Sequence, residues 1–280
     1  MHRWTRLALT TALAVAALPA AGQVVMPRAS PHATVTQRIG VTDISIDYHR
    51  PGVKGRKIWG ELVPYGQPWR VGANDRTIIE FSTDVTVDGQ PLPAGSYGLV
   101  AIPSETTWTL AFSKVTAAWG AFTYDAKDDA ARITVTPEAT TDAVEWMEFR
   151  FEDLGTDTAK IALRWEKLRV PFTVKVDLDK TVAAHVAANA SWGALNGAAT
   201  WANDRGTDLD LALRWANASI AIEKTFFNLR TKARILAKKG DKAAAVATGE
   251  EALQVAAAMA TPPGGATLPD FKKEVEGWKK

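Results

Sequence analysis

The stretch Val41-Thr42-Asp43-Ile44-Ser45-Ile46-Asp47-Tyr48 decides the fold class, because polar and apolar residues alternate along it from Asp43 onward. In an extended strand successive side chains point to opposite faces. Ile44, Ile46 and Tyr48 therefore fall on one face, and the polar residues between them fall on the other. Such alternation predicts a β-strand that is buried on one side only.

Similar short runs, separated by turn residues, continue from Ala33 to Leu178. They lie at 78–81, 97–102, 108–112, 132–135, 144–151, 159–165 and 168–176. Asp88-Gly89 between two apolar runs is typical of a hairpin, because this pair adopts the positive φ angles of a type I′ turn. About ten strands without intervening helices favour an antiparallel β-sandwich, of jelly-roll or immunoglobulin-like type, over a parallel α/β sheet.

The chain changes character after Asp179, where alanine becomes frequent and apolar residues recur every three to four positions. Several positions repeat with an offset of 33 residues: Ala212 and Ala245, Ser219 and Ala252, Ile220 and Leu253, Thr207-Asp208 and Gly240-Asp241. This period resembles a degenerate tetratricopeptide repeat, and chance likeness among alanine-rich helices is the alternative. Two repeats fall short of the three or so that stabilise a free array, so we expect the helices to pack on the sandwich or on a partner.

The first 22 residues have the pattern of a secretory signal peptide. A basic start with Arg3 and Arg6 precedes an apolar run from Leu7 to Leu18, and small residues follow at 20–22. The run is shorter than the roughly 20 residues that a membrane-spanning helix needs. The expected organisation is a signal peptide over 1–22, a β-sandwich domain over 23–178 and a small bundle of helical hairpins over 179–280. The mature protein would be periplasmic or secreted, without a membrane anchor.

Composition excludes several classes of function. The chain has 33 Lys and Arg, 31 Asp and Glu, and no Cys. Loss of Arg3 and Arg6 with the signal peptide makes the two charge counts equal, which argues against a nucleic-acid partner. Without Cys there is no disulfide, thiolate ligand or cysteine nucleophile. His32, His49 and His185 lack the spacing of a zinc site, so we expect neither a metal nor a cofactor. A hard cation bound by carboxylates is the alternative.

The segment 48–74 is the candidate site, because it is too rich in Gly, Pro, Arg and aromatic residues for a routine connection. Its prolines stiffen a backbone that its glycines allow to turn tightly. Guanidinium groups bind oxyanions, and aromatic faces stack on rings. The predicted ligand-binding residues are Asp47, His49, Arg50, Arg56, Trp59, Tyr65, Trp69, Arg70 and Asn74.

Six motifs in order carry a family resemblance: Arg28-Ala29-Ser30-Pro31, Ile39-Gly40, Asp47-Tyr48-His49-Arg50-Pro51-Gly52-Val53-Lys54-Gly55-Arg56, Val63-Pro64-Tyr65-Gly66, Trp69-Arg70-Val71-Gly72-Ala73-Asn74 and Pro93-Ala94-Gly95-Ser96-Tyr97. From about Arg28 to Leu178 the chain resembles the bacterial family called domain of unknown function 2911. The resemblance implies an exported protein with helical repeats at its carboxyl end, and it implies no catalytic residue. His49 departs from the family pattern, which has a small hydroxyl residue at this position.

Two functions remain open, and we assign no catalytic residue. The first is an exported binding or interaction module whose partner is a small molecule, a glycan or an envelope protein. The second is an exported hydrolase with Asp47 and His49 as a carboxylate-oriented base and Arg70 as an anion clamp. A third, purely structural interpretation is that acidic residues neutralise the arginines of the loop: Asp43, Asp47, Glu61 and Asp75.

The signal-peptide pattern makes a direct prediction about the mature chain. Cleavage after Gly22 should leave Gln23 as the first residue, because the small side chains at 20–22 suit a signal peptidase. Mass spectrometry of the protein from its native envelope fraction should identify that terminus. Recovery of intact Met1 from the same fraction would contradict the prediction.

Overall fold

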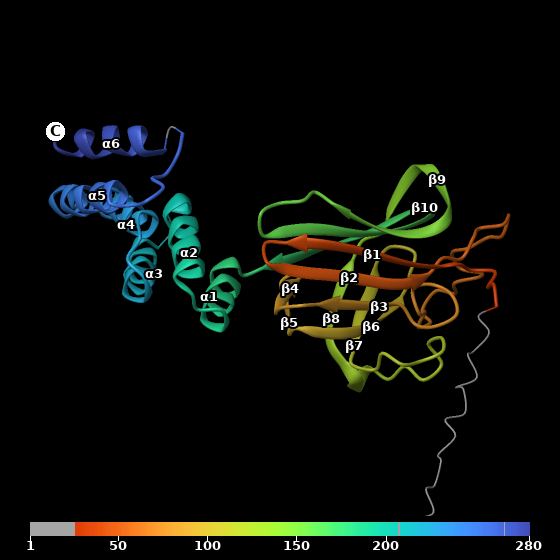
Figure 1. The fold of residues 1–280 in the computed structure, drawn as a ribbon. Coiled ribbons are helices and arrows are strands. Elements are labelled where there is room, and N and C mark those ends of the chain that lie inside the picture. Colours follow the sequence, from red (N-terminus) through yellow and green to blue (C-terminus); the bar gives the residue numbers. More distant parts are fainter. Residues whose placement is uncertain (1–25, 207, 266) are drawn as a thin grey trace, which may run out of the picture.

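The computed structural model describes residues 26–206, 208–265 and 267–280, so the predicted signal peptide over 1–22 lies outside the described residues. Two antiparallel sheets are followed by six helices in this part of the chain (Figure 1). The predicted order, strands first and helices second, is confirmed. No helix among the described residues is long and apolar enough to cross a bilayer.

Ten strands form the two sheets of the described chain. In spatial order the larger sheet contains β1 (His32–Ile39), β2 (Thr42–His49), β3 (Ile78–Phe81), β6 (Gly95–Ile102), β7 (Trp108–Ser113) and β8 (Asp129–Val135). The smaller sheet contains β5 (Gln90–Leu92), β4 (Val85–Val87), β10 (Thr158–Val176) and β9 (Glu138–Glu152). Every neighbouring pair is antiparallel. A short 3₁₀ turn, Ala126–Asp128, precedes β8.

One apolar core lies between the two sheets. Its side chains come from the apolar residues that alternate with polar ones along the strands. In β2, Ile44 and Ile46 are fully buried, whereas the polar residues between and beside them are partly or fully exposed. Val174 of the smaller sheet belongs to the same core. The predicted turn at Asp88-Gly89 connects β4 to β5 with φ angles of 44° and 82°. We call residues 26–177 the β-domain.

The helices begin where the composition changes. They are α1 (Leu178–Ala188), α2 (Trp192–Arg205), α3 (Leu209–Ile222), α4 (Phe226–Lys238), α5 (Lys242–Ala257) and α6 (Thr267–Trp278). Side-chain oxygens of Asp208 and Asp241 cap α3 and α5, so the 33-residue offset places two equivalent helix starts. Two apolar clusters hold the helices together, one containing Trp215 and the other containing Phe226.

The helices extend away from the sheets instead of covering them (Figure 1). Leu178 at the start of α1 packs into the core of the β-domain, and Trp201 of α2 packs against both this core and the first helical cluster. The expected packing of the helices on the β-domain is therefore confined to this junction. The reason is that small side chains such as Ala216 and Ala252, both fully buried, are used in contacts among the helices themselves.

Gly98 of β6 occupies a place where no side chain fits. A Cβ atom there would lie 2.5 Å from the carbonyl oxygen of Val115 and 2.6 Å from Cδ of Arg76. We expect Gly98→Ala to lower the free energy of unfolding of the β-domain by about 1–3 kcal/mol, as overpacking does elsewhere. Chemical denaturation followed by circular dichroism measures this change.

Gly197 of α2 provides the control, because a Cβ atom there meets no heavy atom within 4 Å. Gly197→Ala should leave the transition of the β-domain unchanged and stabilise the helices by up to about 1 kcal/mol, since alanine has the higher helix propensity. If Gly98→Ala also left the unfolding transition of the β-domain unchanged, the backbone around Gly98 would be able to shift and accommodate a Cβ atom.

Candidate functional site

The segment between β2 and β3 is a shaped loop held to the sheets by its backbone. Trp69 and Ala101 of β6 exchange two hydrogen bonds, with N–H···O distances of 2.7 and 2.8 Å between nitrogen and oxygen. Val71 and Asn74 have φ angles of 55° and 57°. Non-glycine residues rarely adopt this conformation, which persists only where the surroundings impose it. The loop is thus a fixed part of the β-domain, as its prolines and glycines predict.

A cluster of four indole rings anchors this loop. Trp59 and Trp69 come from the loop, Trp108 from β7 and Trp165 from β10. Trp59 packs edge-on against each of the other three, with ring centroids 5.0–5.9 Å apart. Trp69 stacks nearly parallel on Trp165 at 6.0 Å. We name these four residues the tryptophan cluster.

A cavity of about 300 Å³ lies beside the tryptophan cluster. It is lined by Ser30, Pro51, Arg56, Leu62, Val63, Trp69, Arg70, Gly72, Ala73, Asn74 and Trp165. Four of the predicted binding residues meet here: Arg56, Trp69, Arg70 and Asn74. No carboxylate belongs to this lining. We name this space the loop cavity.

Three buried N–H donors at or beside the loop cavity have no acceptor among the described residues. They are Nε of Arg70 and Nε1 of Trp59 and Trp165. Trp165 is only 1% exposed, so open solvent does not surround its indole. Burial lowers the pKa of Arg70, and the charge of Asp75 opposes this change. An unpaired buried donor normally costs about 1–3 kcal/mol, so these groups need an acceptor that the described protein does not supply.

The structure does not bring Asp47 and His49 together as a hydrogen-bonded pair. They share one face of β2, as alternation requires, but Asp47 Oδ2 lies 2.6 Å from Nε2 of His32 on the neighbouring strand. Nδ1 of His49 lies 4.0 Å from Oδ2 of Asp75. Burial lowers the pKa of His49. Neither Asp47 nor His49 lines the loop cavity, so the dyad on which the hydrolase interpretation depends is not preassembled.

The acids expected to neutralise the arginines of the loop are engaged elsewhere. Asp43 binds Arg38, Glu61 binds Lys57 and Asp75 binds Arg28. Carbonyl oxygens hold the loop arginines instead. Arg50 donates to the carbonyls of Met147 and Trp146 and lies 3.6 Å from Glu148, whereas Arg56 donates to those of Gly52 and Val53.

The remaining predicted residues lie at the edge of this region. Tyr65 is 39% exposed and outside the lining of the loop cavity. Asn74 lines the cavity and donates from Nδ2 to the carbonyl oxygen of Ser30. Sequence reasoning missed Trp165, since its position beside the loop follows from the pairing and packing of β10. His32 was missed as the partner of Asp47, although both lie on adjacent strands, because the register was unknown.

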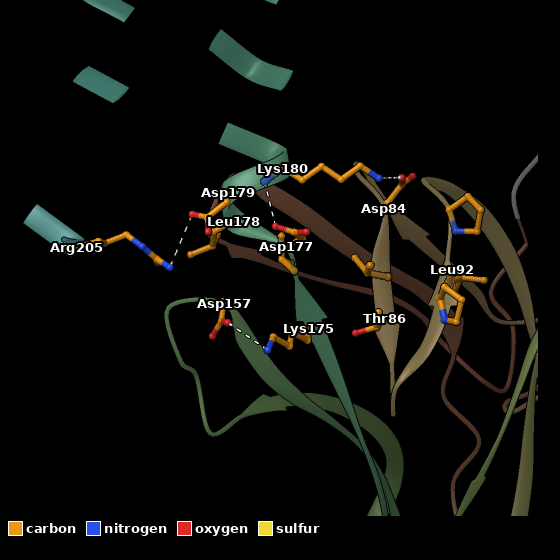
Figure 2. Close-up of a pocket in the computed structure, with 14 residues that line it drawn as sticks. Asp84, Thr86, Leu92, Asp157, Lys175, Asp177, Leu178, Asp179, Lys180 and Arg205 are labelled. Carbon is orange, nitrogen blue, oxygen red and sulfur yellow. Dashed lines mark hydrogen bonds and ion pairs between the residues drawn. The ribbon is translucent and has the colours of Figure 1, made fainter. Parts of the chain in front are cut away.

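A second and larger cavity, of about 670 Å³, lies at the junction between the β-domain and the helices (Figure 2). Its cations all face acids: Lys180 and Asp84 at 2.8 Å, Arg205 and Asp179 at 3.9 Å, Lys175 and Asp157 at 3.9 Å. No sequence motif predicted this cavity, because its residues come from β4, β5, β10, α1 and α2. Each cation of this lining thus has an acid of the same lining as its partner, unlike the cations of the loop cavity.

Comparison with protein families is informative for the β-domain. The sequence model described as "Protein of unknown function (DUF2911)" matches residues 30–174, which is more than half of the chain. The chain belongs to this family. The match includes both sheets almost completely, together with the loop and the tryptophan cluster, and it ends before the helices of this DUF2911 protein. No match was found among curated proteins or among solved structures.

Two arginines of this region should differ in how much stability is lost when methionine replaces them. Arg76 is 3% exposed and donates to the carbonyls of Val115 and Gly120, so Arg76→Met should lower the free energy of unfolding by about 3 kcal/mol. Arg70→Met should change it by less than about 1 kcal/mol, because the buried Nε that is removed has no described acceptor. Urea denaturation of both variants measures the difference. A large loss for Arg70→Met would show that Arg70 ties the loop to the sheets.

Proposed function

We propose that this DUF2911 protein is an exported binding module, and that the loop cavity holds a small molecule. The observation that carries the proposal is a group of three buried N–H donors without a described acceptor. Arg70 Nε and Trp165 Nε1 belong to residues that line the cavity, and Trp59 Nε1 belongs to the ring that packs on Trp165. Binding sites combine apolar walls with a few fixed polar groups. Indole rings provide such walls here, and a loop fixed by backbone hydrogen bonds keeps the donors in place without a ligand.

The proposal also includes the type of β-sandwich and the type of helical repeat. A β-domain of jelly-roll or immunoglobulin-like type would present the ligand site, and tetratricopeptide-like helices would contact an envelope partner. The repeated helix starts after Asp208 and Asp241 support such a repeat. The sequence of residues 1–22 supports export to the periplasm or the medium.

The alternative hydrolase lacks a comparable observation. Its proposed base, His49, has Asp75 rather than Asp47 as its closest acidic partner, and a nucleophile is not assigned. Catalysis by this pair would require the two side chains to approach within hydrogen-bond reach. We therefore propose binding rather than hydrolysis.

A screen with a blocked cavity tests the proposal. Neutral, anionic and cationic small molecules are screened for a rise in the melting temperature of the mature protein, since a ligand that binds only the folded state stabilises it. Ser30 lines the loop cavity, so Ser30→Phe should abolish the response. Ser96→Phe is the matched control, because Ser96 is exposed on β6. A complete lack of binders, or binders that Ser30→Phe leaves unaffected, would refute the proposed function.

A further inference from the structure

The charge of the loop cavity indicates the chemistry of its ligand. Arg56 and Arg70 are the charged residues among those that line it, and both are cations. The acid that influences Arg70 is Asp75, which lies outside the lining and already binds Arg28 at 2.9 Å. Arg70 is partly buried and Arg56 is exposed, and the lining of the cavity contains no acid that could pair with either of them. The loop cavity therefore has an excess of positive charge, whereas the junction cavity does not.

The unpaired groups are all donors. Nε of Arg70 and the indole nitrogens of Trp59 and Trp165 each present one N–H and cannot accept a hydrogen bond. A ligand that satisfies them must supply oxygen lone pairs. Water can supply these acceptors, but it cannot balance the two guanidinium charges. An oxyanion supplies both the acceptors and the opposite charge.

The size and walls of the cavity limit the rest of the ligand. A volume of about 300 Å³ is at the small end of the range for ligand pockets, which excludes a polymer chain lying within it. Trp69 and Trp165 stack nearly parallel, and both line the cavity, together with Leu62 and Val63. These walls accommodate a compact body attached to the anionic group.

We infer that the loop cavity binds a small oxyanion, either free or carried as a carboxylate or phosphoryl group on a compact molecule. This inference rests on the proposed function and specifies the class of ligand. Arg70 is its central residue, because it lines the cavity and its Nε is a buried, charged donor without a described acceptor. Arg56 contributes charge, while its own N–H groups remain on the carbonyls of Gly52 and Val53.

Inorganic phosphate, benzoate and benzamide are suitable probes, because benzoate and benzamide have similar shapes and differ in charge. Each is titrated into the mature ¹⁵N-labelled protein, and the indole N–H signals are followed by NMR. Trp165→Phe and Trp59→Phe assign the two signals. We expect benzoate or phosphate to shift both signals saturably, and benzamide to bind at least about tenfold more weakly, as charge-assisted hydrogen bonds require.

Variants separate the anion site from general charge effects. Arg70→Met should weaken anion binding at least about tenfold. Arg38→Met removes the same charge at a side chain 67% exposed on β1 and should leave anion binding unchanged. Equal binding of benzoate and benzamide, both lost in Ser30→Phe, would overturn the anion inference and leave the proposed function standing. No saturable shift with either anion would also overturn the inference, and the wider screen would then decide the proposed function separately.

Discussion

The packing of four indole rings is the constraint on which the β-domain depends. Trp108 comes from the larger sheet, Trp165 from the smaller one, and Trp59 and Trp69 from the loop that crosses between β2 and β3. Each aromatic pair contributes about 0.5–1.5 kcal/mol beyond the burial of its surface. The same contacts therefore join the two sheets and fix the course of the loop, and two of the rings, Trp69 and Trp165, line the loop cavity. Stability and the shape of the candidate site are consequently determined by the same residues.

The arginines of this region illustrate how differently one residue type is used. Arg76 and Arg50 donate to carbonyl oxygens of neighbouring segments and so fasten the loops of the β-domain. Arg70 keeps a buried Nε without a described acceptor. Arg76 also keeps one such nitrogen, Nη2, but its Nε and Nη1 are bonded to carbonyl oxygens. An unpaired buried polar group reduces stability, and a bound water, an ion or a ligand can supply the missing partner. Between residues 50 and 76, Arg50 and Arg76 thus tie segments of the β-domain together, and Arg70 is the position for which we propose ligand binding.

Local sequence patterns predicted much of the fold, but they did not predict the contacts between segments that are distant in the sequence. Alternation between Asp43 and Tyr48 predicted β2 because exposure in a half-buried strand follows the side-chain period. The change after Asp179 placed the helices, since helical periodicity is also local. The loop was recognised by its composition, but its cavity required Trp165 from β10 and Ser30 from the chain before β1. The hydrogen bond between Asp47 and His32 depends on the register of β1 and β2. This register places His32 opposite His49, which makes His32 a diagonal neighbour of Asp47, and it cannot be read from either strand alone.

The narrow junction between the β-domain and the helices determines how salt affects the position of the helices. Lys180 and Asp84, which form its shortest ion pair, are 65% and 55% exposed. Pairs this open contribute little energy, and salt screens what remains over about 8 Å at physiological ionic strength. The apolar contact of Leu178 with the core is insensitive to salt by comparison. When the ionic strength changes, the helices would thus stay attached at a fixed point, while the restraint on their orientation varies with salt.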